Sequence, residues 1–182
     1  MTPIFPTLHT EHLILREIVA SDANALFQIH SDAETMRWFG VDPITDIAQA
    51  NQITAMFAGW FAGGTGVRWG IERRSDGRLI GSCGFFRWNK SWRNCLLGFE
   101  LARDATGQGH MTAALRAVLA HGFGPMGLHR IQAESHADNH ASIAVLTRLG
   151  FRFEGVHREQ AFWGGQFHDL NCYAVLGPEW RQ

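Results

Sequence analysis

A glycine-containing stretch at positions 103–115, RDATGQGHMTAAL, carries the residues best suited to binding an anion. Gly107 and Gly109 follow a short apolar segment and stand directly before helix-forming residues. The first N–H groups of a helix have no carbonyl partner and attract phosphate, and glycine lets a phosphate approach the backbone closely. No Lys-Ser/Thr pair follows Gly109, and no third glycine completes a dinucleotide fingerprint. The residues alone leave open both a phosphate-binding loop and a plain strand-to-helix turn.

Two glutamates on nearby segments are candidates for moving a proton. Glu100 lies in the apolar segment CLLGFEL at 95–101, and Glu134 lies in HRIQAESH at 129–136. A carboxylate in a cleft can act as a general base, whereas a carboxylate on a strand can equally be solvated or paired with a cation. Both interpretations stay open for each glutamate.

The three cysteines, Cys83, Cys95 and Cys172, are an odd number and form no CxxC pair. This spacing favours reduced thiols over a disulfide framework or a zinc knuckle. Residues 81–84, GSCG, lie inside a strand-like segment rather than at a strand-to-helix turn. They do not form a nucleophile elbow, so a cysteine hydrolase built on Cys83 is a minor alternative.

Among the ten histidines, only His136 and His140 have a spacing that suggests metal binding. Two residues four apart share a face only when both lie on one helix. A helix cap at Asp138 or Asn139 falls between them, so we expect no metal site.

Hydrophobic periodicity places these residues in an α+β fold. We expect strands at 12–18, 67–74, 78–88, 95–101, 129–136, 151–162 and 167–176. We expect helices at 23–30, 33–39, 108–122 and 139–149, and one from a cap at Thr45 or Asp46 to about 61. The turn Asp76-Gly77 predicts a hairpin, so that 67–101 forms an antiparallel meander. We find no internal repeat or linker, so residues 1–182 are expected to form a single domain, a mixed, mostly antiparallel sheet flanked by helices.

Composition narrows the function classes. The 182 residues are 46% hydrophobic and 18% charged, as in an ordinary globular protein, and their formal net charge of -1 argues against nucleic acid as a partner. The opening MTPIFPTLHT has no secretory pattern, and the longest apolar run, at 55–64, is too short to span a membrane. A cytoplasmic protein without a membrane partner is therefore expected.

Four patterns, in order along the sequence, resemble the GNAT superfamily of acyl-CoA N-acyltransferases, and more narrowly the branch that contains the ribosomal-protein N-terminal acetyltransferases. The opening L-x-T-x-x-L-x-L-R is matched by Leu8, Thr10, Leu13, Leu15 and Arg16. The central pattern G-Y-E-L is matched by 98–101, GFEL, and the helix signature N-x-x-S-x-x-x-L-x-x-x-G-F by Asn139, Ser142, Leu146, Gly150 and Phe151. The tail pattern E-G…R-E…G-x-x-x-D is matched by Glu154, Gly155, Arg158, Glu159, Gly165 and Asp169.

The resemblance implies that acetyl-CoA is the acyl donor, with no metal, and that backbone amides of the glycine loop bind its pyrophosphate. The cofactor-binding residues it implies are Leu101, Arg103, Gly107, Gln108, Gly109, His110, Met111, Thr112, Asn139 and Ser142. Two of the loop positions depart from the superfamily pattern, Thr106 where Gln or Arg is usual and Met111 where Gly or Ala is usual. Met111 is compatible with the role if it points into the core, as its helical spacing predicts.

The resemblance also implies catalytic roles. Direct attack by an amine needs a base, and a backbone N–H near Leu101 to bind the oxyanion. Glu100 is the first choice of base, and Glu134, at a position where some family members carry a catalytic glutamate, is the second. Many superfamily members protonate the thiolate with a tyrosine at the position held here by Leu146, so Ser142 is expected to substitute. The acceptor is expected to be a protein N-terminal α-amine or a small amine, and a homodimer is possible.

The aromatic side chains Trp38 and Trp60, with Trp88 or Trp92, are expected to line the acceptor cleft. A different class of function stays open beside the enzyme, namely an acyl-CoA-binding sensor that lacks catalysis.

Overall fold

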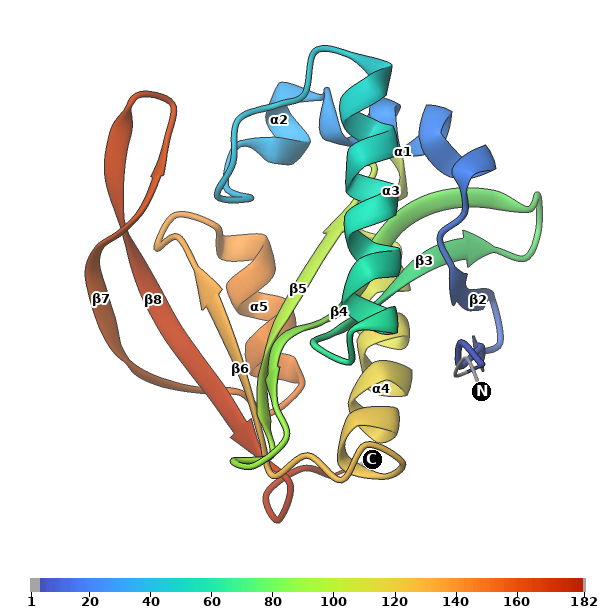
Figure 1. The fold of residues 1–182 in the computed structure, drawn as a ribbon. Helices are drawn as coiled ribbons and strands as arrows, with labels where there is room; N and C mark the ends of the chain where they lie inside the picture. The colour runs from blue at the N-terminus through green and yellow to red at the C-terminus, as the bar shows by residue number, and fades with distance from the viewer. Residues whose placement is uncertain (1–3, 182) are drawn as a thin grey trace.

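A single eight-stranded sheet in the order β1-β2-β3-β4-β5-β6-β8-β7 organises the protein (Figure 1). The computed structural model describes residues 4–181, so residues 1–3 and 182 of the expected domain lie outside the described residues. The strands are β1 (Leu8–His9), β2 (Leu13–Glu17), β3 (Val67–Arg73), β4 (Arg78–Asn89), β5 (Asn94–Leu101), β6 (Arg130–Ser135), β7 (Arg152–Trp163) and β8 (Gln166–Leu176). The helices are α1 (Ala23–His30), α2 (Ala33–Met36), α3 (Ile47–Ala62), α4 (His110–Phe123) and α5 (His140–Arg148), with short 3-10 turns at Ala20–Asp22 and Arg103–Ala105.

The predicted fold class is confirmed. β5 and β6 pair in parallel, and all other neighbouring strands pair antiparallel, including the predicted meander β3-β4-β5. The helix expected at 33–39 is shorter and ends at Met36, after which the backbone turns to Gly40 with φ +90°. The two-residue strand β1 was not predicted, because two residues are too few to show a period.

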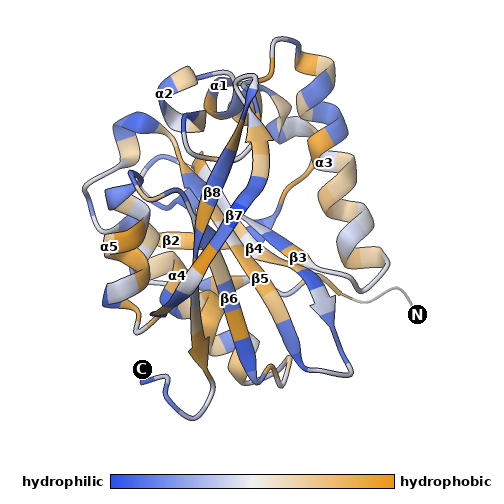
Figure 2. Ribbon diagram, turned by 90° about the vertical axis from the view of Figure 1, so that its left-hand side faces the viewer, coloured by the Kyte–Doolittle hydropathy of each residue, from blue (hydrophilic) through white to orange (hydrophobic). Residues whose placement is uncertain are grey.

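Helices cover both faces of the sheet, as Figure 2 shows with α4 and α5 on one side and α3 on the other. Leu115, Val118 and Leu119 of α4 are fully buried in the main core. Phe57 of α3 and Leu26 of α1 form a second core cluster on the opposite face. Removing these apolar faces from water is the main force that holds the layers together.

The two parallel strands separate at their carboxyl ends (Figure 1). The β5–β6 ladder ends at the pair Leu97↔Ala133, although β5 continues beside β4 to Leu101 and β6 continues beside β8 to Ser135. The amide of Ala102 donates to Ile80 of β4 at 2.8 Å. Because successive strand amides point to opposite edges, the amides of Phe99 and Leu101 face the gap between β5 and β6. This gap positions the candidate site.

Candidate active site

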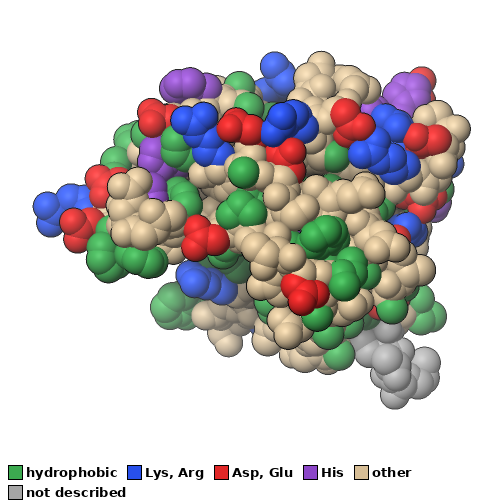
Figure 3. Space-filling view, turned by 90° about the horizontal axis from the view of Figure 1, so that it is seen from above, with side chains coloured by type: hydrophobic (Ala, Val, Ile, Leu, Met, Phe, Trp, Pro, Cys, Tyr) green, Lys and Arg blue, Asp and Glu red, His purple; other side chains and the backbone are tan. Residues whose placement is uncertain are grey.

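A cleft of about 1440 Å³ opens where β5 and β6 diverge. Its walls come from the glycine loop, the start of α5, the ends of β5 and β6, and the segment from α1 to α3. Figure 3 views the molecule from above, at the end where the strands separate, and shows acidic and basic side chains interspersed. The cleft therefore extends from the glycine loop at the start of α4 to the segment from α1 to α3.

The glycine loop presents unpaired backbone amides to this cleft. Gly107 and Gly109 have φ of +75° and +79°, a conformation that favours glycine. Within residues 4–181, the amides of Gly107, Gln108 and Gly109 donate to no backbone carbonyl. The amides of His110, Met111 and Thr112 are the first of α4 and have no partner inside the helix. This arrangement is the geometry that binds an anion at a helix N-terminus.

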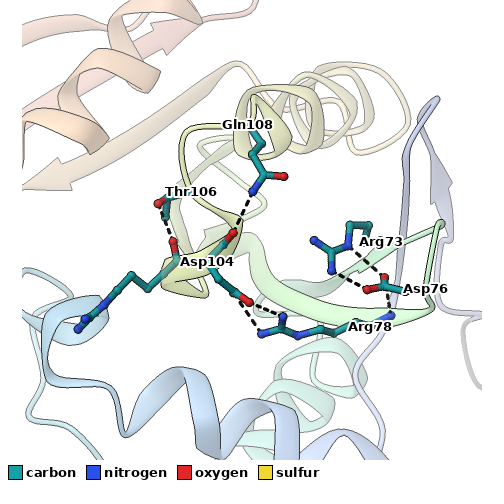
Figure 4. A network of polar contacts seen from close by, with 7 residues as sticks. Arg73, Asp76, Arg78, Asp104, Thr106 and Gln108 are labelled. Carbon is teal, nitrogen blue, oxygen red and sulfur yellow. Dashed lines mark hydrogen bonds and ion pairs between the residues drawn. The ribbon is translucent and has the colours of Figure 1, made fainter.

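Side-chain hydrogen bonds and an ion pair hold the conformation of the loop (Figure 4). The Thr106 hydroxyl donates to the Arg103 carbonyl at 2.7 Å, and the Gln108 side-chain amide donates to the Asp104 carbonyl at 2.9 Å. Arg78 pairs with the Asp104 carboxylate at 2.5 Å. Gln108 thus has its side chain engaged within the loop, which leaves its backbone amide as the group available to a ligand.

The remaining expected cofactor-binding residues of this wall occupy different environments. Met111 is 7% exposed and packs in the main core, so its side chain leaves the loop accessible, as predicted. Burial lowers the pKa of His110, which favours its neutral form. Thr112 accepts a long hydrogen bond from Arg148 at 3.5 Å, and the Arg103 guanidinium pairs with Asp32 at 3.0 Å.

Replacing Gly109 with valine is expected to weaken CoA binding about tenfold. A β-branched residue in this left-handed conformation costs about 1–2 kcal/mol and adds a side chain where a phosphate would approach. Calorimetric titration with CoA measures the effect. Gly127→Val is the matched control, since Gly127 has φ +62° and equally open space but lies in the turn after α4. Unchanged CoA affinity in Gly109→Val would contradict the assignment of the loop.

The start of α5 forms the next part of the wall. The Asn139 side chain caps the helix by accepting from the Ser142 amide at 3.1 Å, and the cap falls between His136 and His140 as expected. Ser142 is half-buried and lines the cleft, while Leu146 is fully buried. The side chain of His136 stacks on Trp38, with ring centroids 4.3 Å apart.

Glu100 lies in a buried ionic cluster with Arg68, Ser82 and His30. Its carboxylate accepts hydrogen bonds from Arg68 and Ser82, and its Oε1 is 3.4 Å from Nε2 of His30. The side chains of Arg68 and Glu100 are 4% and 3% exposed. Burial opposes ionisation of this carboxyl, but the charge of Arg68 and the hydrogen bonds from His30 and Ser82 outweigh it and keep the pKa of Glu100 below its usual value. These surroundings stabilise the ionised carboxylate of Glu100, and both of its oxygens already accept hydrogen bonds.

Glu134 lies on the neighbouring strand β6 and is more accessible to solvent than Glu100. Its side chain lines the cleft beyond the end of the β5–β6 ladder and is 23% exposed. Its Oε1 is 3.2 Å from Nδ1 of His157. Donor atoms of Glu134, His157 and Cys172 all lie within 4.8 Å of one another, a grouping with the chemistry of metal ligands. No sequence pattern indicates this grouping, since the three residues lie on three strands.

The aromatic wall differs in part from the expectation. Trp38 and Trp60 line the cleft, but Trp88 and Trp92 do not, and Trp92 is 75% exposed. Phe86 lines the cleft instead. The β4 bulge between Phe86 and Asn89 shifts Trp88 out of the cleft wall. Arg87 beside it has φ +51°, a left-handed conformation that is rare outside glycine.

Cys83 is fully buried, and burial raises its pKa to about 12, so its thiol is unsuited to act as a nucleophile. Sequence reasoning did not predict that Arg68, Ser82 and His30 contact Glu100. A single arginine in a strand and a histidine at a helix end carry no signal of mutual contact.

Within residues 4–181, the longest apolar helices fall short of what a membrane span requires.

Comparisons with known proteins agree with this geometry. The sequence model of the acetyltransferase (GNAT) domain matches residues 12–152. The uncharacterized N-acetyltransferase YoaA of Bacillus subtilis (strain 168) is 36% identical over 175 residues, which cover 96% of this chain and 99% of the relative. The [ribosomal protein uS5]-alanine N-acetyltransferase of Escherichia coli (strain K12) is 29% identical over 118 residues, which cover 64% of this chain and 61% of the relative.

Among solved structures, Mycobacterium smegmatis RimJ in complex with CoA-disulfide superposes with a TM-score of 0.86 at 26% identity, covering 97% of this chain and 88% of that one. Both the family model and the match to YoaA cover the glycine loop and the separating strands. The protein therefore belongs to the acetyltransferase (GNAT) family and is an acyl-CoA N-acyltransferase.

Proposed function

We propose that this enzyme transfers the acetyl group of acetyl-CoA to a primary amine by direct attack, without an acyl-enzyme intermediate. The acceptor is a protein N-terminal α-amine of the ribosomal-protein type or a small-molecule amine. The observation that carries the proposal is the gap between β5 and β6, where unpaired strand amides lie beside the unpaired amides at the start of α4.

The loop amides from Gly107 to Thr112 would bind the pyrophosphate of the donor. The amide of Leu101, which faces the gap, would donate to the thioester oxygen as negative charge develops there. The acyl carbon would then lie within reach of an amine that enters from the wall formed by α1 to α3.

Glu134 takes the proton from the attacking amine, directly or through a water. It is preferred to Glu100 because its carboxylate is partly exposed in the cleft, whereas both oxygens of Glu100 are engaged in the buried cluster. Ser142 donates a hydrogen bond to the departing thiolate, and the proton that Glu134 takes from the amine reaches this thiolate through water, so that CoA leaves as the thiol. Glu100 has the supporting role of holding Arg68 and His30 in place.

The function is tested by incubating the protein with acetyl-CoA and a panel of amines, and by following release of the CoA thiol. The panel contains peptides with different first residues and small primary amines. We expect thiol release with at least one class, and mass spectrometry should locate the acetyl group on the amine nitrogen. CoA binding without thiol release from any amine would favour the sensor and contradict the proposal.

A further inference from the structure

The cleft has an apolar lobe on the side of α3. It is defined by six side chains, which are Ile53, Met56, Phe57, Trp60, Phe86 and Leu96. The rings of Trp60 and Phe86 are stacked with centroids 5.9 Å apart, and those of Phe57 and Trp60 are tilted at 5.3 Å. The lobe is therefore a packed aromatic surface that belongs to the cleft wall.

The apolar lobe begins where the strands separate. Gly98 is the first residue of β5 past the last β5–β6 pair, Leu97↔Ala133. A Cβ atom built on Gly98 would lie 3.2 Å from the Phe86 ring and 2.9 Å from a guanidinium nitrogen of Arg68. Glycine at this position lets the aromatic wall reach the strand backbone, so a group seated in the lobe lies next to the gap.

The charges around the apolar lobe disfavour a cationic occupant. The acidic residues that line the cleft are Glu34, Glu100, Glu134 and Asp138, which belong to α2, β5, β6 and the loop before α5. On the lobe side the charged groups are arginines: Arg68 lies 5.4 Å from the Phe57 ring centroid, and Arg87 is an exposed residue of the wall. Arg68 and Glu100 form one ion pair, so their charges offset each other, and Arg87 remains as a positive charge on the lobe side.

Met56 leaves part of the apolar lobe open to solvent. Its side chain belongs to a residue that is 44% exposed, on the face of α3 that meets the cleft. Methionine is flexible and polarisable, and it adapts to apolar ligands of different shape. Covering this exposed apolar residue and the stacked aromatic rings beside it with an apolar group lowers the free energy of the complex.

We propose that the acceptor amine carries an aromatic or branched aliphatic group that binds in the apolar lobe, close to the nitrogen that is acetylated. This rests on the proposed function and narrows it: linear polyamines are poor acceptors. A peptide with a large apolar first residue, or a small arylalkylamine, carries its apolar group close to the amine, so the group can bind in the lobe while the amine lies at the gap. Burial of such a group favours it over alanine by about tenfold or more in kcat/KM.

The test uses peptides that differ only in the first residue, Phe, Leu, Ala or Asp, together with an arylalkylamine and a linear polyamine. Thiol release gives kcat/KM for each acceptor, in the wild-type protein and in Met56→Glu. The variant places a carboxylate at the partly exposed edge of the lobe, where it disturbs little packing. Val156→Glu is the matched control, because Val156 is similarly exposed at 47% but lies on β7 outside the cleft.

We expect wild-type protein and Val156→Glu to prefer Phe and Leu over Ala by about tenfold or more, and Met56→Glu to lose most of that preference with the KM for acetyl-CoA unchanged. Equal kcat/KM across the peptides, or a preference that Met56→Glu leaves intact, would overturn the inference. Calorimetric titration of the same acceptors into CoA-saturated protein provides a second measurement. If no amine releases thiol, the proposed function fails, whereas the calorimetric preference still decides the occupant of the lobe.

Discussion

Arg68→Met is expected to lower the free energy of unfolding by about 3–5 kcal/mol, because removing one member of a buried ion pair leaves the other charge uncompensated. Arg68 is 4% exposed and supplies the cation for Glu100, which lies in the same buried cluster with Ser82. Methionine replaces the aliphatic part of arginine, so the loss reports the missing charge more than a missing volume. Urea denaturation followed by fluorescence measures it.

The loss should depend on pH with a defined sign. In the wild-type protein the folded-state pKa of Glu100 is lowered below its ordinary 4.5, so the stability it contributes is present above that value and is lost as the pH falls through the folded pKa. Without Arg68, burial dominates and raises the folded pKa of Glu100, so the variant loses stability as the pH rises. The difference between the two proteins should therefore be smallest in acid and grow toward neutral pH.

Two further variants make this prediction specific. Arg68→Met combined with Glu100→Met removes both charges and should recover most of the lost stability. Arg130→Met breaks an ion pair whose partner, Glu154, is 44% exposed, and it should cost about 1 kcal/mol or less. If Arg68→Met costs no more than Arg130→Met, the buried cluster is not an important source of stability.

Glu134→Gln is expected to lower kcat by about 100-fold, the smaller end of the usual contribution of a general base. Glutamine keeps the shape of the side chain and can still contact His157, but it cannot accept the proton. The affinity for CoA should stay unchanged. Steady-state kinetics measures the loss in kcat, and calorimetric titration measures the CoA affinity.

Glu154→Gln is the matched control for this substitution, because Glu154, on β7, pairs with Arg130 and does not line the cleft. A Glu134→Gln enzyme with wild-type kcat would remove Glu134 as the base. Glu100→Gln would then be the next variant to compare. Both its kcat and its free energy of unfolding should be measured, since Glu100 also holds the buried cluster together.

The sequence predicted the features that arise from local patterns. Alternation and helical spacing located most strands and helices, and Met111 faces the core as its spacing indicated. The Asn139 cap and the glycine loop were also visible, because capping and left-handed glycine depend on neighbouring residues.

Contacts between distant segments could not be predicted in this way. Glu100 meets Arg68 across 32 positions and His30 across 70, and no single-sequence period reports such pairs. The choice of Phe86 over Trp88 for the cleft wall depends on a bulge in β4, which shifts the side chains that follow it. The accessibility that distinguishes Glu134 from Glu100 likewise results from tertiary packing.

The ion pair between Arg103 and Asp32 can carry only a small coupling between the glycine loop and the wall formed by α1 to α3. Arg103 belongs to the segment that leads into the glycine loop, and Asp32 caps α2 in the acceptor wall, so the pair is a direct link between the two binding regions. Their side chains are 62% and 33% exposed, and such a pair contributes about 0–1 kcal/mol. Through this link, donor and acceptor can strengthen each other's binding by at most about fivefold, equally in both directions, and added salt should weaken the effect.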